Sequence, residues 1–193
     1  MTGSASEAKT SHTLRLAEAV RDAMDRSGRT LATLESCTGG LIASALTDVP
    51  GAGYLLGGGV AYDTHVKQAF GVPAQTIQTH GVVSRAVAMA LAEAAQKWFG
   101  ADIGLGITGV AGPGPEAGIA PGTAFVAITG GESAEVAELA VGKSDRFEAK
   151  SEMVDIALAM LVERLEADFS PIERDRVESC SAMQSRSSIR ARN

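Results

Sequence analysis

Three consecutive residues in the stretch 35–40 carry a hydroxyl or a thiol: Ser36, Cys37 and Thr38. An apolar run precedes this stretch and a helix-like run follows it, which predicts a turn from a strand into a helix. Such a turn presents main-chain N–H groups at the positive end of the helix. It is therefore a candidate nucleophile and ligand site, although an ordinary turn with Ser and Thr capping the helix is the alternative. The candidate residues of this turn are Glu35, Ser36, Cys37, Thr38, Gly39 and Gly40.

A second pair of reactive side chains, Tyr62 and Lys67, follows the next predicted strand. A serine hydroxyl is a poor nucleophile until a base takes its proton. A partly desolvated lysine has a lowered pKa and could take that proton, directly or through a neighbouring tyrosine. Because Tyr62 ends the strand and Asp63 begins a short helix, we expect the Tyr62 hydroxyl to meet Lys67. Taken singly, the three residues fit a capping Ser, an interface Tyr and a solvated Lys, but together they favour a site at this turn with Lys67 as the candidate base.

A long Pro- and Gly-rich loop over 109–122 follows another predicted strand, over 101–108. Loops of this length and composition are usually functional. The carboxyl ends of parallel strands share one crevice, so we expect the loop to converge with Ser36 and Tyr62. The N–H groups after Ser36 could hold an oxyanion. Both the Gly39–Gly40 helix end and the 109–114 loop are possible anion-binding sites. From this segment the candidate binding residues are Thr108, Gly109, Ala111, Gly112 and Pro113.

Two other patterns resemble those of oxidoreductases that use nicotinamide cofactors. The segment 104–109 reads G-x-G-x-x-G, but that fingerprint follows a strand and opens a helix, whereas here it lies within a strand. Lys67 follows Tyr62 by five residues, which is the wrong spacing for one face of a helix. The sequence therefore disfavours a dinucleotide oxidoreductase, and strand packing explains the glycines better.

The predicted elements alternate between helix and strand and end with a hairpin. This order predicts a single three-layer α/β/α sandwich on a mixed, mostly parallel sheet of about five strands. We expect one domain over 11–169, after a disordered lead-in over 1–10 and before a flexible Ser- and Arg-containing tail over 170–193. The predicted strands are 30–34, 57–62, 101–108, 123–129 and 135–141. The predicted helices are 11–27, 38–47, 64–70, 84–99 and 145–168, with 77–83 irregular. The helix over 84–99 is amphipathic, with a core stripe of Val87, Ala90, Leu91, Ala94, Ala95 and Trp98.

Composition narrows the classes of partner. The chain has 193 residues, is 45% hydrophobic and carries a formal net charge of −6, which disfavours a nucleic-acid or anionic-membrane surface. Its two cysteines and three histidines are scattered and match no metal-ligand spacing. No apolar run approaches the ~20 residues of a membrane span, and the N-terminus lacks a secretory signal. We therefore expect a cytoplasmic protein that needs neither metal nor cofactor.

Several of these motifs occur together, in the same order, in a known family. The chain resembles the C-terminal domain of competence/damage-inducible protein A (CinA) and its stand-alone relatives, the nicotinamide-nucleotide amidohydrolases, over about Leu14 to Leu165. The motifs that carry the resemblance are Glu35-Ser36-Cys37-Thr38-Gly39-Gly40, Val60-Ala61-Tyr62 with Lys67, Thr79-His80-Gly81-Val82-Val83-Ser84, Ile107-Thr108-Gly109-Val110-Ala111-Gly112-Pro113 and Pro121-Gly122-Thr123.

The resemblance implies a hydrolase that deamidates nicotinamide mononucleotide (NMN) to nicotinate mononucleotide and ammonia without a metal. It implies Ser36 as the nucleophile, Lys67 as the base and Tyr62 as a relay or orienting group. Cys37 and Thr38 then only line the pocket. It further implies an anticodon-binding-domain-like fold, a homodimer and a role in pyridine nucleotide salvage within NAD metabolism.

The sequence also departs from the family pattern. Where the family often shows Gly-Asp-Arg, Gly142 is followed by Lys143-Ser144-Asp145-Arg146, and Lys150 stands near a later family Arg. The loop before Pro121 lacks the Lys that is common there, and the tail after Ser170 has no counterpart. These differences leave an alternative open, in which the chain is a catalytically weak nucleotide-binding or interaction module of CinA type.

Overall fold

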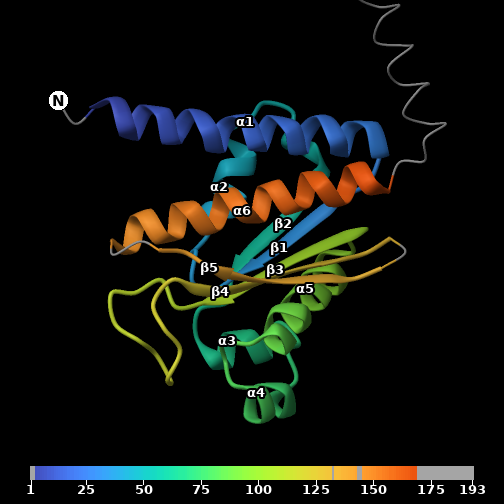
Figure 1. Ribbon diagram of the computed structural model, residues 1–193. Coiled ribbons are helices and arrows are strands. Elements are labelled where there is room, and N and C mark those ends of the chain that lie inside the picture. The colour runs from blue at the N-terminus through green and yellow to red at the C-terminus, as the bar shows by residue number, and fades with distance from the viewer. Residues whose placement is uncertain (1–2, 132, 143–144, 169–193) are drawn as a thin grey trace, which may run out of the picture.

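The computed structural model describes residues 3–131, 133–142 and 145–168, and of residues 3–11 it describes the backbone only. Within these residues a five-stranded sheet with the order β2-β1-β3-β4-β5 lies between two layers of helices (Figure 1). The strands are β1 (Leu31–Glu35), β2 (Leu55–Val60), β3 (Ile103–Gly109), β4 (Thr123–Thr129) and β5 (Glu135–Ala140). The helices are α1 (Gly3–Ser27), α2 (Leu41–Thr47), α3 (Thr64–Ala69), α4 (Ala74–His80), α5 (Arg85–Phe99) and α6 (Arg146–Ala167), with a 3-10 turn at Ala52–Tyr54.

The sheet is mixed, as the order of predicted elements indicates. β1 pairs in parallel with both β2 and β3, whereas β3 with β4 and β4 with β5 are antiparallel pairs. The α5 crossover leads to the central strand β3, while β4 and β5 form the predicted hairpin. The carboxyl ends of β1, β2 and β3 therefore lie at one edge of the sheet, where the chemistry was expected.

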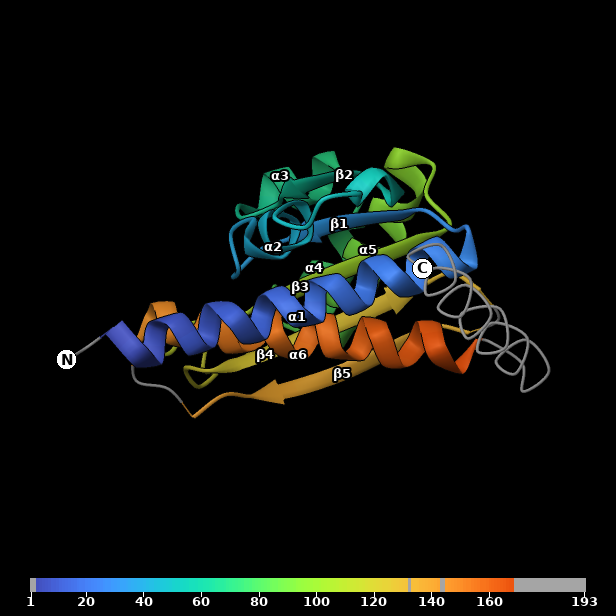
Figure 2. The same cartoon turned by 90° about the horizontal axis from the view of Figure 1, so that it is seen from above.

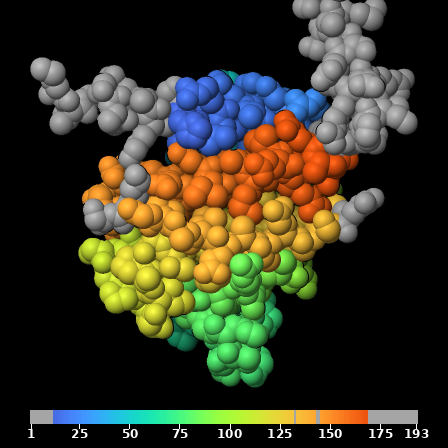
Figure 3. Space-filling model, viewed as in Figure 1, coloured from blue at the N-terminus to red at the C-terminus, as the bar shows by residue number. Residues whose placement is uncertain are grey.

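The helices divide between the two faces of the sheet. α1, α2 and α6 cover one face, and α3, α4 and α5 lie on the other (Figures 1 and 2). Figure 3 shows α1 in blue packed beside α6 in orange, with the yellow-green loop after β3 standing out at one edge. Small and branched aliphatic side chains fill both interfaces, as expected from an aromatic content of 4%. The three-layer α/β/α fold is thus confirmed.

The amphipathic helix α5 shows how closely local sequence sets an element's bounds. The Ser84 hydroxyl accepts a hydrogen bond from the Val87 N–H at 3.3 Å, and Gly100 ends the helix with a φ of 67°. Trp98 was expected in the core stripe, but it is 61% exposed and packs edge-on against Phe70 with ring centroids 5.2 Å apart. Its neighbour Phe99, in the same turn, packs on β2 instead, where a Cβ at Gly57 would lie 2.4 Å from the Phe99 ring.

The G-x-G-x-x-G segment lies within β3, and its first two glycines let α5 approach the sheet closely. A Cβ at Gly104 would lie 2.0 Å from the carbonyl oxygen of Ala92, and one at Gly106 would lie 2.4 Å from that of Ala88. A Cβ at either position would force the backbone of α5 away from the sheet. The packing of the helix on the sheet therefore requires both glycines. The structure therefore supports the interpretation that these glycines serve packing.

Several element bounds differ from the sequence prediction. The helix predicted from Ser11 begins at Gly3, so residues 3–10 are helical where we expected a disordered lead-in. The segment 77–83, expected to be irregular, contains most of α4. α2 begins at Leu41 instead of residue 38, for a reason given below, and β2 begins and ends two residues early. The predicted tail over 170–193 lies outside the described residues. None of the helices in the described part of the chain is both long and apolar enough to cross a membrane.

Candidate active site

Three chain segments meet at the carboxyl edge of the parallel strands. The N–H of Ser36 donates to the carbonyl of Ile107 at 3.0 Å, which joins the turn after β1 to the end of β3. On the other side, the N–H of Ala61 donates to the carbonyl of Glu35 at 2.7 Å, which places Tyr62 beside the same turn. A cavity of about 210 Å³ opens here, and Ser36, Tyr62, Lys67 and the loop after β3 line it. The predicted convergence is therefore present.

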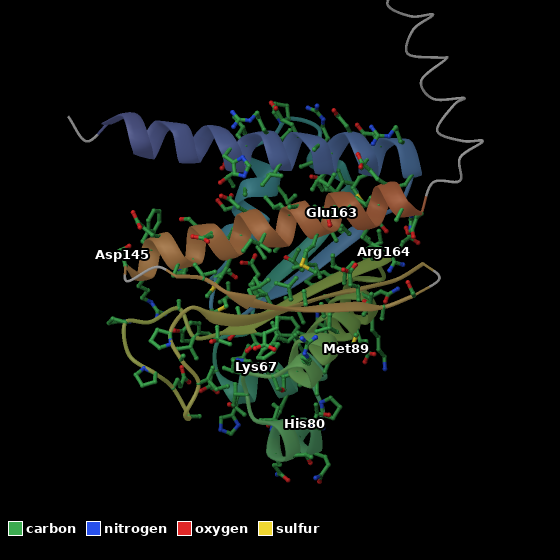
Figure 4. All side chains as sticks on the ribbon, in the orientation of Figure 1. Lys67, His80, Met89, Asp145, Glu163 and Arg164 are labelled. Carbon is green, nitrogen blue, oxygen red and sulfur yellow. The ribbon has the colours of Figure 1, made fainter. Side chains whose placement is uncertain are left out.

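The central contact of the cavity joins Ser36 and Lys67. The Nζ atom of Lys67 donates to the Ser36 Oγ at 3.0 Å and to the main-chain carbonyl of Tyr62 at 2.7 Å. Lys67 is fully buried and Ser36 is 7% exposed. Lys67 comes from α3, whose first turn is fixed by the Asp63 carboxylate accepting from the His65 N–H at 2.7 Å. Figure 4 shows Lys67 on the α3 side of the sheet.

Burial changes the acid–base behaviour of this lysine. Desolvation of the ammonium group lowers the pKa of Lys67 below its ordinary 10.5, against the smaller opposing charges of Asp63, Cys37 and Glu116. A lowered pKa makes the neutral amine accessible closer to neutral pH. Since this amine already contacts the Ser36 hydroxyl, it can accept the hydroxyl proton without a rearrangement.

Tyr62 occupies a different position from the one we expected. Its hydroxyl accepts a hydrogen bond from Nη2 of Arg146 at 2.8 Å. The main-chain carbonyl of Tyr62, and not the hydroxyl, contacts Lys67. The side chain is 58% exposed and forms part of the cavity rim. The expected meeting of the Tyr62 hydroxyl with Lys67 is therefore wrong, because the strand end turns the phenol outward and the carbonyl inward. The backbone of Tyr62 orients Lys67, and its ring shapes the rim.

Glu35, expected to bind substrate, instead caps helix α2. Its buried carboxylate accepts four hydrogen bonds and lies outside the cavity lining. Because an anion already occupies the positive end of α2, the Gly39–Gly40 helix end is not available as an anion site. The donors are the Thr38 hydroxyl at 2.7 Å and the N–H groups of Gly40, Ile42 and Ala43 at 3.0, 3.1 and 2.9 Å.

Thr38, Gly39 and Gly40 likewise serve this turn and lie outside the cavity lining. Gly39 and Gly40 have φ angles of 67° and 94°, a conformation that other residues adopt only with strain. These left-handed residues delay the start of α2 until Leu41 and leave Ser36 ahead of the helix. Lys150, near a family Arg position, lies beside the turn: a Cβ on Gly39 would be 3.3 Å from its Nζ.

Cys37 lines the cavity beside Ser36, but its thiol is poorly suited to be the nucleophile. The residue is 4% exposed, and burial raises the pKa of the Cys37 thiol to about 12. Its sulfur lies 4.0 Å from that of Met153 in α6, within the apolar layer. Since the thiolate is the reactive form of cysteine, Ser36 is the better-placed nucleophile of the two.

The loop after β3 supplies the opposite wall of the cavity. Thr108, Gly109, Ala111 and Gly112 line it as predicted, whereas Pro113, joined to Gly112 by a cis peptide bond, lies outside the lining. The Thr108 hydroxyl donates to the carbonyl of Val82 at 3.0 Å, so it fixes the loop before α5 and is not free to face a ligand in this arrangement. Val110 and Gly114, within the predicted 109–114 loop, also line the cavity, whereas sequence reasoning missed the further lining residues Val82, Val83, Pro115, Glu116 and Arg146.

Arg146 is the most informative of the missed residues. It is the first residue of α6, after the N-cap Asp145, and it lines the cavity. Its Nη1 donates to the carbonyl of Gly112 at 2.6 Å while Nη2 contacts the Tyr62 hydroxyl. The resemblance of Asp145-Arg146 to the family's Gly-Asp-Arg was a signal for this residue. Its position was not predictable, because β4 and β5 intervene between the loop and α6.

The chain is similar to known proteins over most of its described length. The family described as the CinA C-terminal domain matches residues 13–165. A CinA-like protein from Gemmatimonas aurantiaca is 44% identical over 138 residues, which are 68% of this chain and 31% of that protein. One from Geotalea daltonii is 46% identical over 114 residues, 58% of this chain and 28% of that protein. The chain thus spans roughly a quarter to a third of the length of these curated relatives.

Solved structures show the same relationship. A CinA superfamily protein from Klebsiella pneumoniae superposes with a TM-score of 0.77 at 32% identity, covering 80% of this chain and 98% of that chain. The competence/damage inducible protein CihA from Agrobacterium tumefaciens gives a TM-score of 0.75 at 33% identity, covering 80% and 96%. By sequence and by fold, the chain belongs to the CinA C-terminal domain family.

Proposed function

We propose that the chain is an amidohydrolase that converts NMN and water to nicotinate mononucleotide and ammonia. The observation that carries the proposal is the buried contact of 3.0 Å between Lys67 Nζ and Ser36 Oγ. It provides a nucleophile with an adjacent base whose pKa is lowered, inside a cavity open to a small molecule. The family resemblance supplies the substrate: a carboxamide on a nucleotide.

In the first half of the proposed reaction, Ser36 Oγ attacks the carboxamide carbon while its proton passes to neutral Lys67. The carbonyl oxygen becomes an oxyanion, for which the main-chain N–H of Cys37, directly after the nucleophile, is the candidate donor. Lys67, now an ammonium, gives its proton to the departing nitrogen. The C–N bond breaks, ammonia leaves, and an ester joins the nicotinoyl group to Ser36.

In the second half, water attacks the ester and Lys67 takes a proton from it. Collapse of the tetrahedral intermediate breaks the bond to Ser36, whose oxygen regains the proton from Lys67. The nicotinic acid group formed releases its remaining proton to solvent, and the product leaves as a carboxylate. The carbonyl of Tyr62, 2.7 Å from the Lys67 nitrogen, holds the amine in place through both halves. The same base thus acts twice, and no metal is required by these steps.

The phosphate of NMN needs a donor set away from Ser36. Of the two predicted anion sites, the start of α2 is occupied by Glu35. The other is the loop 109–114, which forms the cavity rim together with Arg146. The Arg146 guanidinium has five N–H donors, and its bonds to Gly112 and Tyr62 use two of them. Its positive charge lies at the rim, where it can attract a phosphate. We assign the phosphate to this rim.

The test is ammonia release from NMN by the purified chain, with chromatographic identification of nicotinate mononucleotide. Ser36→Ala is expected to lose at least about 10³-fold in turnover, because no other hydroxyl can replace the nucleophile. Ser44→Ala removes an exposed hydroxyl from α2 and serves as the matched control with wild-type turnover. Both variants should keep the wild-type unfolding temperature within a few degrees.

Unchanged turnover in Ser36→Ala would overturn the nucleophile assignment. Calorimetric binding of NMN to the wild-type chain without ammonia release would favour the alternative function, a nucleotide-binding module of CinA type. The two outcomes are distinguishable because binding and turnover are measured on the same protein.

A further inference from the structure

Glu116 is a carboxylate that a tight turn holds at the wall of the cavity. Its N–H donates to the carbonyl of Ile119 at 3.1 Å, and the N–H of Ile119 donates back at 2.9 Å. Between them, Ala117 and Gly118 have φ angles of 49° and 80°. Two left-handed central residues with reciprocal bonds are the features of a type I′ hairpin turn, which fixes the backbone of the residue that precedes it.

The turn carries a conformational cost at Ala117. A side chain with a Cβ in the left-handed region is disfavoured, so such residues persist only where the surroundings determine them. Glu116, Ala117 and Gly118 are all exposed, and Glu116 also lines the cavity. The turn therefore places the Glu116 carboxylate at the cavity although Ala117 must adopt a disfavoured left-handed conformation.

The charges around the cavity make this carboxylate unusual. Of its fifteen lining residues, the charged ones are Lys67, Arg146 and Glu116. Lys67 at the floor is the proposed base, and Arg146 at the rim is the group assigned to the phosphate. The charge of Glu116 raises the pKa of Lys67, against the larger effect of desolvation. Glu116 repels a phosphate, and in the occupied cavity it attracts a positive group on the ligand.

We propose that Glu116 recognises a positively charged ring bearing the carboxamide, and so selects the oxidised pyridinium nucleotide over its reduced, neutral dihydropyridine form. The inference rests on the proposed function and specifies its substrate class. In NMN the ring nitrogen carries a positive charge and the amide is attached to the same ring. An amide placed at Ser36 therefore brings that charge into the cavity whose wall carries Glu116.

The test compares two ligands with the same amide, ribose and phosphate: NMN and its reduced form, NMNH. Binding is measured by calorimetry on Ser36→Ala, which prevents turnover during the titration. We expect this parent to bind NMN at least about tenfold more tightly than NMNH, since one charge pair differs. Adding Glu116→Gln should weaken the binding of NMN by about tenfold and change the affinity for NMNH by less than about threefold.

Two further variants isolate the charge. Glu116→Asp keeps the charge on a shorter side chain and should retain part of the preference for NMN. Glu93→Gln removes one exposed carboxylate on α5, outside the cavity lining, and should leave both affinities unchanged. It controls for the change of one unit in net charge.

Equal weakening of both ligands by Glu116→Gln would overturn the inference, because it would show a role in loop structure. Tighter binding of both ligands would also overturn it, since Glu116 would then act only by repelling the phosphate. If the wild-type chain releases ammonia from NMN but Glu116→Gln leaves the preference for NMN over NMNH unchanged, this inference fails and the proposed function stands. If the chain neither binds NMN nor releases ammonia from it, the proposed function fails and the inference with it.

Discussion

The Nζ atom of Lys67 lies 3.0 Å from the Oγ atom of Ser36, although 31 positions separate the two residues in the chain. The contact is possible because β1 and β2 are parallel neighbours, so the turn after one strand and the helix after the next share an edge of the sheet. Both side chains are buried there. This relationship gives the motifs around Ser36 and Lys67 a chemical role that can be tested.

Lys67 should set the rising limb of the pH–rate profile. Only the neutral amine can accept the Ser36 proton, so activity should increase with pH until the lysine is deprotonated. Because desolvation lowers the pKa of Lys67, the midpoint of this rise should lie below 10.5. Measuring kcat/KM for NMN from about pH 6 to about pH 9 checks the position of the limb.

Substitutions of Lys67 provide the control for that profile. Lys67→Met removes the base and should lower kcat by about 10² to 10⁴-fold. Lys67→Arg keeps a cation but stays protonated, so it should be equally impaired. A raised KM with unchanged kcat in both variants would instead identify Lys67 as a binding residue.

Tyr62→Phe should be a mild change. Its hydroxyl contacts Arg146, whereas Lys67 is held by the carbonyl of residue 62, which phenylalanine retains. We expect kcat within about threefold of the wild type and a KM raised by up to about tenfold, since the rim loses one hydrogen bond to a charged group. A loss of about 10²-fold in kcat would support the relay role implied by the family resemblance.

Arg146→Ala should weaken recognition of the phosphate. With NMN, we expect KM to rise by roughly tenfold to a hundredfold, the usual effect of losing a charge-assisted hydrogen bond. With nicotinamide riboside, which lacks the phosphate, the same substitution should change KM by less than about threefold. Arg21→Ala, on α1 and outside the cavity lining, is the matched control. Equal effects on both substrates would place the phosphate elsewhere.

Glu35→Gln should reduce stability. The carboxylate accepts four hydrogen bonds at the start of α2, and an amide in its place can accept only through its oxygen. The free energy of unfolding should fall by about 2 kcal/mol, measured by urea denaturation. Glu93→Gln, which changes an exposed carboxylate on α5, should leave it unchanged. A lowered activity at wild-type stability would instead restore Glu35 as a ligand-binding residue.

The sequence was sufficient for the layers of the fold and for the elements with strong local signals. The α5 caps at Ser84 and Gly100 and the alternation of strands and helices are local or periodic features, and the structure confirms them. The nucleophile turn, the base after the next strand and the loop after β3 were predicted to converge for the same reason: strand ends of a parallel sheet meet at one edge.

What the sequence could not settle was which atom of a residue faces the cavity. Glu35 and Ser36 are adjacent, yet one carboxylate turns into the start of α2 and the neighbouring hydroxyl turns toward Lys67. Tyr62 offers a hydroxyl and a carbonyl, and the direction of the strand end decides that the carbonyl meets the lysine.

Tertiary structure alone also brought Arg146 and Glu116 to the rim. Arg146 is separated from the loop by two strands, and the backbone position of Glu116 depends on the left-handed turn at Ala117 and Gly118. The place of the nucleophile turn and of Lys67 at the sheet edge followed from residue types and element order, and the family resemblance selected Ser36 within that turn. The pairing of their atoms, the charges on the rim and the filling of the α2 helix end depended on packing between distant segments, which local sequence does not encode.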